Sequence, residues 1–174
     1  MSTRFFTHIT AALVLLSSAV LATAADKASQ KFITEAIQGN LAEVQVGKLA
    51  QEKSQSDAVR SFGQTLASDH SAANDKATKV AQQLGVTPPN EPNAKQKATY
   101  DKLSKLSGAA FDRAFVREMV TDHKKDIKEY EKEAKKKDDP AAQYAQETLP
   151  VLHKHLEMAQ NLESGNKVGQ ARAR

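Results

Sequence analysis

The sequence contains no cysteine and no tryptophan, and only 5% of its 174 residues are aromatic. Without cysteine the chain has neither a disulfide framework nor the lipid-modified cysteine of an exported lipoprotein. No basic block is interleaved with aromatic side chains, so nothing supports nucleic-acid binding. A glycine-rich phosphate loop is also missing, which leaves nucleotide chemistry without support.

Only one long apolar run is present, at the N-terminus. Arg4 gives it a positive start, residues 9–22 are almost entirely apolar, and Ala22-Thr23-Ala24 has the small-x-small pattern of a cleavage site. We therefore expect a secretory signal peptide over residues 1–24, a folded domain over 25–163 and a basic disordered tail over 164–174. No later segment is apolar enough to cross a bilayer, so we expect a periplasmic or secreted protein of the cell envelope, without a transmembrane segment.

The charges of the mature chain are nearly balanced. Loss of Arg4 with the signal leaves 24 of the 25 lysines and arginines against 21 acidic residues, and both signs are mixed along the sequence. This is an ordinary protein surface, and it identifies no partner. Association with the envelope and formation of a homo-oligomer both stay open.

Helical periodicity dominates the mature chain, and alternating runs of β-branched residues are missing. Asp57, Ser107 and Asp139 are expected as N-caps, Gly85 suits the position after a helix, and Pro150 should kink the last helix. The predicted helices cover residues 27–53, 57–84, 94–106, 108–137 and 140–163.

The loop lengths predict the topology. Short loops near Ser54 and Asp138 join the long helices into two hairpins, whereas the connection over residues 85–107 can run the length of a bundle. This is the single-crossover topology of ferritin-like folds, although a simple up-down bundle with an elaborate loop would give a similar sequence. We therefore predict an all-α, ferritin-like four-helix bundle with a short extra helix in the crossover between helices two and three.

Each long helix carries one titratable residue in its apolar stripe. These residues are Glu43, His70, His123 and His155. Counted from the short loops at 1.5 Å per residue, Glu43 and His70 lie at similar depths, as do His123 and His155, and the two pairs meet near the middle of the bundle. His153 falls on the opposite face from His155 and is expected at the surface.

Three imidazoles and one carboxylate form a ligand set for a single divalent transition metal, namely zinc, iron, manganese or copper. Asp69, Asp122 and Asp126 are candidates to orient the imidazoles, with Asp126 favoured because it follows His123 by one turn. The alternative is a structural or stress-related module in which the same cluster is a metal-free hydrogen-bond network that responds to pH.

Four sequence blocks follow one another along the chain, namely Glu43–Ala50, Ser68–His70, Phe111–Asp112 through Asp122–His123, and Leu149–Leu156. Together they resemble one family, the exported bacterial ferritin-like domains of unknown function 4142, often labelled predicted outer-membrane proteins. The resemblance covers about Ser29 to Leu162 and implies a ferritin-like bundle in the periplasm or at the envelope, without a defined activity.

The sequence departs from the diiron ferritins, which use Glu-x-x-His motifs on two helices. Ala67, Val120 and Leu152 stand three residues before the three core histidines, so the bridging carboxylates cannot be assembled. Ferroxidase activity is not expected, and the sequence favours a role other than catalysis.

Overall fold

The computed structural model describes residues 26–172 and is helical throughout, with no strand among these residues. The signal peptide predicted for residues 1–24 and the last two residues of the predicted tail lie outside the described part. The helices are α1 (Lys27–Lys53), α2 (Asp57–Gln83), α3 (Ala94–Ser104), α4 (Gly108–Glu133) and α5 (Pro140–Arg172).

Local side-chain chemistry sets most helix ends. Ser56, rather than Asp57, is the N-cap of α2, and its hydroxyl accepts a hydrogen bond from the backbone amide of Val59 at 3.4 Å. Asp57 is instead the first helical residue, where its negative charge interacts favourably with the positive end of the helix dipole. Gly85 follows α2 with φ 69°, the left-handed conformation that favours glycine.

The second half of the chain shows one confirmed cap and two shifted helix ends. Asp139 accepts a hydrogen bond from the amide of Ala141 at 2.8 Å, as expected of the N-cap before Pro140. Ser107 occupies the N-cap of α4 without a side-chain hydrogen bond, and α4 ends at Glu133, before the predicted residue 137. Helix α5 contains Pro150 and continues to Arg172, past the predicted end at residue 163.

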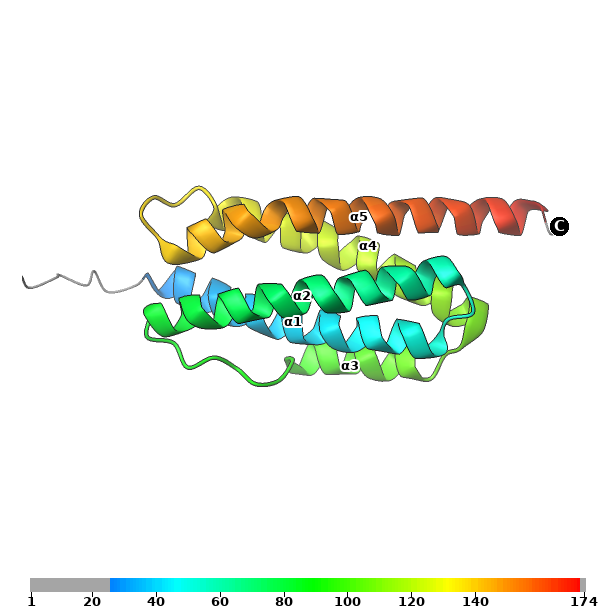
Figure 1. The fold of residues 1–174 in the computed structure, drawn as a ribbon, viewed down its shortest axis with the longest axis horizontal. Coiled ribbons are helices and arrows are strands. Elements are labelled where there is room, and N and C mark those ends of the chain that lie inside the picture. Colours follow the sequence, from blue (N-terminus) through cyan, green and yellow to red (C-terminus); the bar gives the residue numbers. More distant parts are fainter. Residues whose placement is uncertain (1–25, 173–174) are drawn as a thin grey trace, which may run out of the picture.

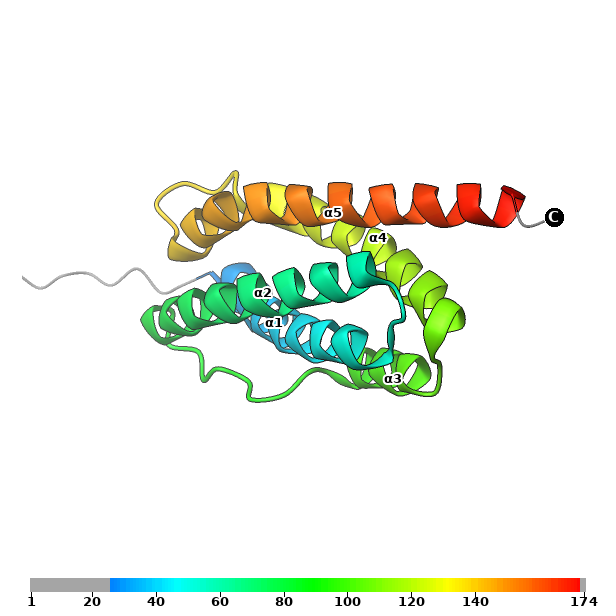
Figure 2. The same ribbon diagram turned by 45° about the vertical axis from the view of Figure 1, so that its right-hand side comes forward.

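The four long helices form two antiparallel hairpins, α1–α2 and α4–α5, whose short loops lie at opposite ends of the molecule (Figure 1). The connection from α2 returns along the length of the helices through α3, which packs against α1 (Figures 1 and 2). As a result α2 and α4 run in the same direction. The two hairpins meet through contacts of α2 with α5 and of α1 with α4.

The apolar core is divided into two clusters, and the predicted polar residues lie between them. Along α2 one cluster contains Val59 to Leu66, the other contains Ala77 to Leu84, and His70 lies between. The same division recurs around the polar residue of each of the other long helices. The four residues concerned are Glu43, His70, His123 and His155, each at most 5% exposed. Helical phase and depth were therefore predicted correctly for all four positions.

Two glycines bring the backbones of α1 and α2 into close contact. A Cβ atom added to Gly63 would lie 2.6 Å from the carbonyl oxygen of Gly47 and 2.7 Å from the Cβ of Ala50. Because no side chain fits between the helices at this level, both positions require glycine. The close approach fixes the position of α1 relative to α2, and with it the relative heights of Glu43 and His70.

Candidate metal centre and adjoining pocket

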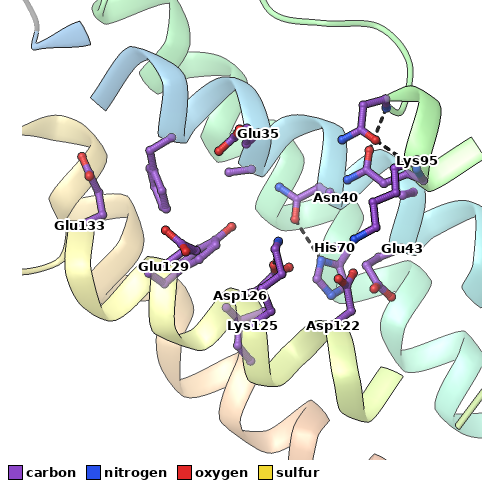
Figure 3. Close-up of a pocket in the computed structure, with 18 of the residues that line it drawn as sticks. Glu35, Asn40, Glu43, His70, Lys95, Asp122, Lys125, Asp126, Glu129 and Glu133 are labelled. Atoms are coloured by element: carbon purple, nitrogen blue, oxygen red, sulfur yellow. Dashed lines mark hydrogen bonds and ion pairs between the residues drawn. The ribbon is translucent and has the colours of Figure 1, made fainter. Parts of the chain in front are cut away.

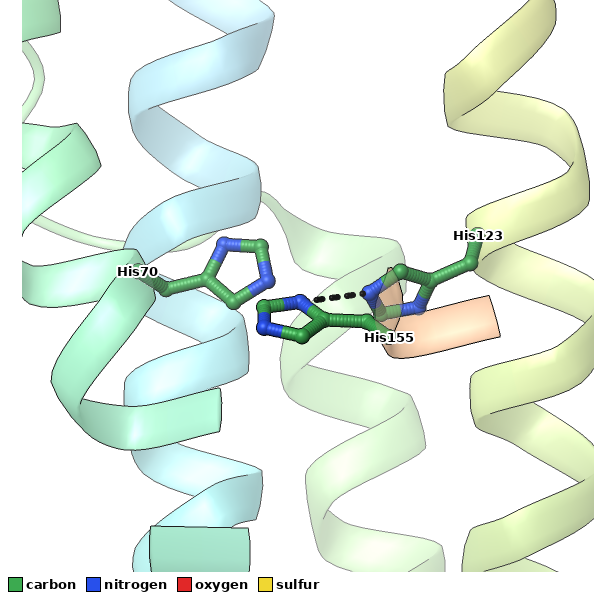
Figure 4. A group of neighbouring side chains, drawn as sticks. All are labelled: His70, His123 and His155. Carbon is green, nitrogen blue, oxygen red and sulfur yellow. Dashed lines mark hydrogen bonds between the residues drawn. The ribbon is translucent and has the colours of Figure 1, made fainter. Parts of the chain in front are cut away.

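His70, His123 and His155 converge from three helices, α2, α4 and α5 (Figure 4). One ring nitrogen from each residue can be chosen so that all three lie within 4.8 Å of one another. Nε2 of His123 lies 3.3 Å from Nδ1 of His155. Two nitrogens bound tetrahedrally to one zinc ion at about 2.0–2.1 Å are separated by about 3.3–3.4 Å, so this pair already has the spacing of a chelate.

The other ring nitrogen of each histidine contacts an oxygen that accepts hydrogen bonds. Nδ1 of His70 lies 2.9 Å from Oδ1 of Asn40, and Nδ1 of His123 lies 3.0 Å from the carbonyl oxygen of Met119. Nε2 of His155 lies 2.9 Å from Oδ2 of Asp69. Since these oxygens accept and do not donate, each of the three nitrogens carries the hydrogen, which fixes the tautomer of the neutral ring.

These tautomers direct three nitrogen lone pairs toward one another. Nε2 of His70 is buried and has no hydrogen-bond partner. Nε2 of His123 and Nδ1 of His155 face each other, and with the opposite nitrogens protonated neither has a hydrogen to donate. Two facing lone pairs repel, and a cation between them, either a proton or a metal ion, removes the repulsion.

Burial disfavours the proton. It lowers the pKa of His123 to about 4, with the neighbouring His155 contributing in the same direction. Burial also lowers the pKa of His155, against the opposing effect of Asp69, and it lowers the pKa of His70 well below the usual value. The three imidazoles are therefore neutral near pH 7, the form in which histidine binds metals.

Glu43 lies beside this group in a pocket of about 600 Å³ between α1, α3 and α4 (Figure 3). Its carboxylate is not part of the compact nitrogen group. Atom Oε2 of Glu43 is buried without a hydrogen-bond partner, and His70 lines the same pocket. Burial raises the pKa of Glu43 well above its usual value, and the nearby carboxylates of Asp122 and Asp126 raise it further. The assignment of Glu43 as a fourth metal ligand stays a prediction.

Comparison with known proteins gives a family but no function. Residues 16–162 match the family described as a domain of unknown function, DUF4142. The chain belongs to this family. No match was found among curated proteins or among solved structures. The match covers the whole histidine cluster of this DUF4142 chain.

Within this DUF4142 domain, the aspartate that contacts a cluster histidine is Asp69. The sequence favoured Asp126, but its carboxylate pairs with Lys125 at 3.2 Å and forms no hydrogen bond with an imidazole of the described residues. Asp122 lines the pocket beside Glu43. Asp69 reaches His155 because α2 packs against α5, an inter-helix contact that spacing along one helix does not reveal.

Three further residues support His70, and sequence reasoning missed their role. Asn40 accepts from the ring of His70, and its amide nitrogen donates to the hydroxyl of Tyr144 at 3.0 Å. That hydroxyl lies 3.4 Å from the hydroxyl of Tyr130. Asn40 precedes Glu43 by one helical turn and lies on the same buried face, which was the available signal.

Among the described residues of the DUF4142 domain, no helix combines the length and apolar character needed to cross a membrane. His153 is exposed, as its helical phase predicted.

Proposed function

We propose that this protein is an exported, ferritin-like helical bundle that binds one divalent transition metal at His70, His123 and His155. A role in holding or buffering a metal in the cell envelope suits a deeply buried site. The N-terminal pattern around Arg4 and Ala22–Ala24 supports export. The two hairpins and the returning connection support the ferritin-like comparison.

The observation that carries the proposal is the convergence of three neutral imidazoles whose outer nitrogens are all hydrogen-bonded. Metal-binding histidines generally donate their second N–H to a carboxylate or carbonyl, which orients the ring and increases its basicity. Asp69 and the carbonyl of Met119 supply such acceptors here, and the side-chain oxygen of Asn40 does the same for His70.

The donor set narrows the choice of metal. Imidazole suits zinc, copper and iron, whereas manganese prefers oxygen ligands. Three nitrogens leave at least one coordination position, which Glu43 or an exchangeable ligand would complete. The bound metal would supply Lewis acidity at that position.

Metal titration of the purified protein tests the proposal. Protein stripped with EDTA and titrated with Zn²⁺ or Cu²⁺ should take up about one ion per chain, and His123→Ala should weaken uptake by about 100-fold or more, because a buried ligand is lost. His153→Ala removes an exposed histidine from α5 and is the matched control. Uptake far below one equivalent in the wild-type protein would contradict the proposal and favour the metal-free, pH-responsive network.

A further inference from the structure

The pocket beside the histidines has a polar lining that the metal proposal does not use. It extends along α4, where five acidic residues recur at intervals of four, four, three and four and all line the pocket (Figure 3). These residues, here called the acidic stripe, are Glu118, Asp122, Asp126, Glu129 and Glu133. At 1.5 Å per residue, neighbouring members are offset by about 4.5–6 Å and the stripe is about 22 Å long.

Glu43 faces this stripe from α1 and is the most deeply buried acid in the pocket. It is 4% exposed, Oε2 has no hydrogen-bond partner, and no ion pair in the described part of the chain includes it. Asp122, Asp126 and Glu118 act on it electrostatically, which places their negative charges close to its carboxylate. A cation entering the pocket would therefore meet a buried carboxyl group that no described residue satisfies, and its charge would favour the ionised form of Glu43 against the effect of burial.

The pocket lysines compensate the stripe only in part. Lys125 pairs with Asp126 at 3.2 Å, and Lys136 pairs with Glu133 at 3.0 Å. Lys95 of α3 acts on Asp122 electrostatically and forms no ion pair with it among the described residues. Seven carboxyl side chains and five lysines line the pocket, so acidic groups are in excess even when every lysine is paired. Burial raises the pKa of Asp126 to about 6, and Asp122 adds to this effect.

The size and walls of the pocket decide between a bare ion and an organic cation. The carboxylates do not form a compact group of ligand atoms among the described residues, as a metal ion requires. A volume of about 600 Å³ is in the range of small-molecule sites. Phe32, Met119 and Tyr130 supply apolar walls for such a molecule.

We propose that this pocket binds a linear aliphatic polyamine, with its amino groups paired to Glu43 and to the acidic stripe and its carbon chain against the apolar walls. Amino groups joined by short extended carbon chains repeat at about the interval of the stripe. The ligand would bring to Glu43 the positive partner that residues 26–172 do not provide. This proposal goes beyond the metal site and does not depend on it.

Calorimetric titration with spermidine, in EDTA and at moderate salt, tests the proposal. Glu43→Gln keeps the shape of the side chain and removes its charge, so it should weaken spermidine binding by about tenfold or more. Glu157→Gln removes the same charge from an exposed position on α5 outside the pocket, and it should change binding by less than about twofold. Asp122→Asn is a second pocket variant and should also weaken binding.

The same titration separates this proposal from the metal proposal. His123→Gln should lose metal and keep spermidine, because His123 does not line the pocket. Absence of spermidine binding, equal loss in Glu43→Gln and Glu157→Gln, or displacement by an equal concentration of Mg²⁺ would each overturn the polyamine assignment. None of these results would count against metal binding by the histidines. Circular dichroism of each variant confirms that the fold is retained.

Discussion

Replacing His123 by glutamine should change how the stability of the metal-free protein depends on pH. Burial lowers the pKa of His123 from the usual 6.5 to about 4 in the folded state. Between these values the unfolded chain binds a proton that the folded chain does not. The contribution of His123 to the free energy of unfolding is therefore intact above pH 6.5 and is lost as the pH falls toward 4.

The size of the effect follows from the shift. One pKa unit corresponds to about 1.4 kcal/mol, so His123 lowers the free energy of unfolding by about 2 kcal/mol at about pH 5 relative to pH 7.5. His123→Gln removes this loss. The raised pKa values of Glu43 and Asp126 act in the opposite direction, but both proteins retain these residues, so they cancel in the difference.

Urea denaturation followed by circular dichroism, in EDTA at several pH values between about 5 and 7.5, measures the difference. As the pH is lowered, the unfolding free energy of the wild type should fall by about 2 kcal/mol more than that of His123→Gln. His153→Gln, at an exposed position, should follow the wild type. A gap that stays constant with pH would refute the reasoning, because His123 would then titrate alike in both states.

Two further predictions concern residues around the site. Asp69→Asn should weaken metal binding by about 10- to 100-fold in the metal titration, because the carboxylate that orients His155 loses its charge. Asp75→Asn, at an exposed position of α2, is the control and should leave the metal affinity unchanged. Gly63→Ala should lower the unfolding free energy by about 1–2 kcal/mol in urea denaturation, since the added methyl group meets the backbone of α1. The control is Gly39→Ala, whose nearest contact is 3.9 Å away, and it should stabilise the protein by up to about 1 kcal/mol. Stabilisation by Gly63→Ala would show that the helices move apart at little cost.

The backbone layout was largely predictable because it depends on local signals. Gly85 and the Asp139–Pro140 pair mark helix ends through their own conformational preferences, and the structure follows them. The burial of His70, His123 and His155 in one layer followed from helical phase and rise per residue. These quantities change little with tertiary context.

The contacts of the site were less predictable because they depend on how helices pack and where side chains turn. Helical phase places the Cβ of Glu43 inward, but it does not determine whether the carboxylate meets the imidazoles or the neighbouring pocket. Asp126 was favoured for its spacing from His123, yet Asp69 makes the contact with His155 across two helices. That contact depends on how closely α2 packs against α5, which a periodic pattern within one helix does not determine.

The histidine ligands are shared between the two hairpins, which the chain connects only through residues 84–107. His70 comes from the first hairpin, and His123 and His155 come from the second. An ion held by all three would be a crosslink between halves that are distant in sequence. By mass action, free metal at 100 times its dissociation constant would add about 2.7 kcal/mol to the stability of the assembled fold. The lifetime of the folded protein would then vary with metal supply, so the abundance of the protein would follow that supply.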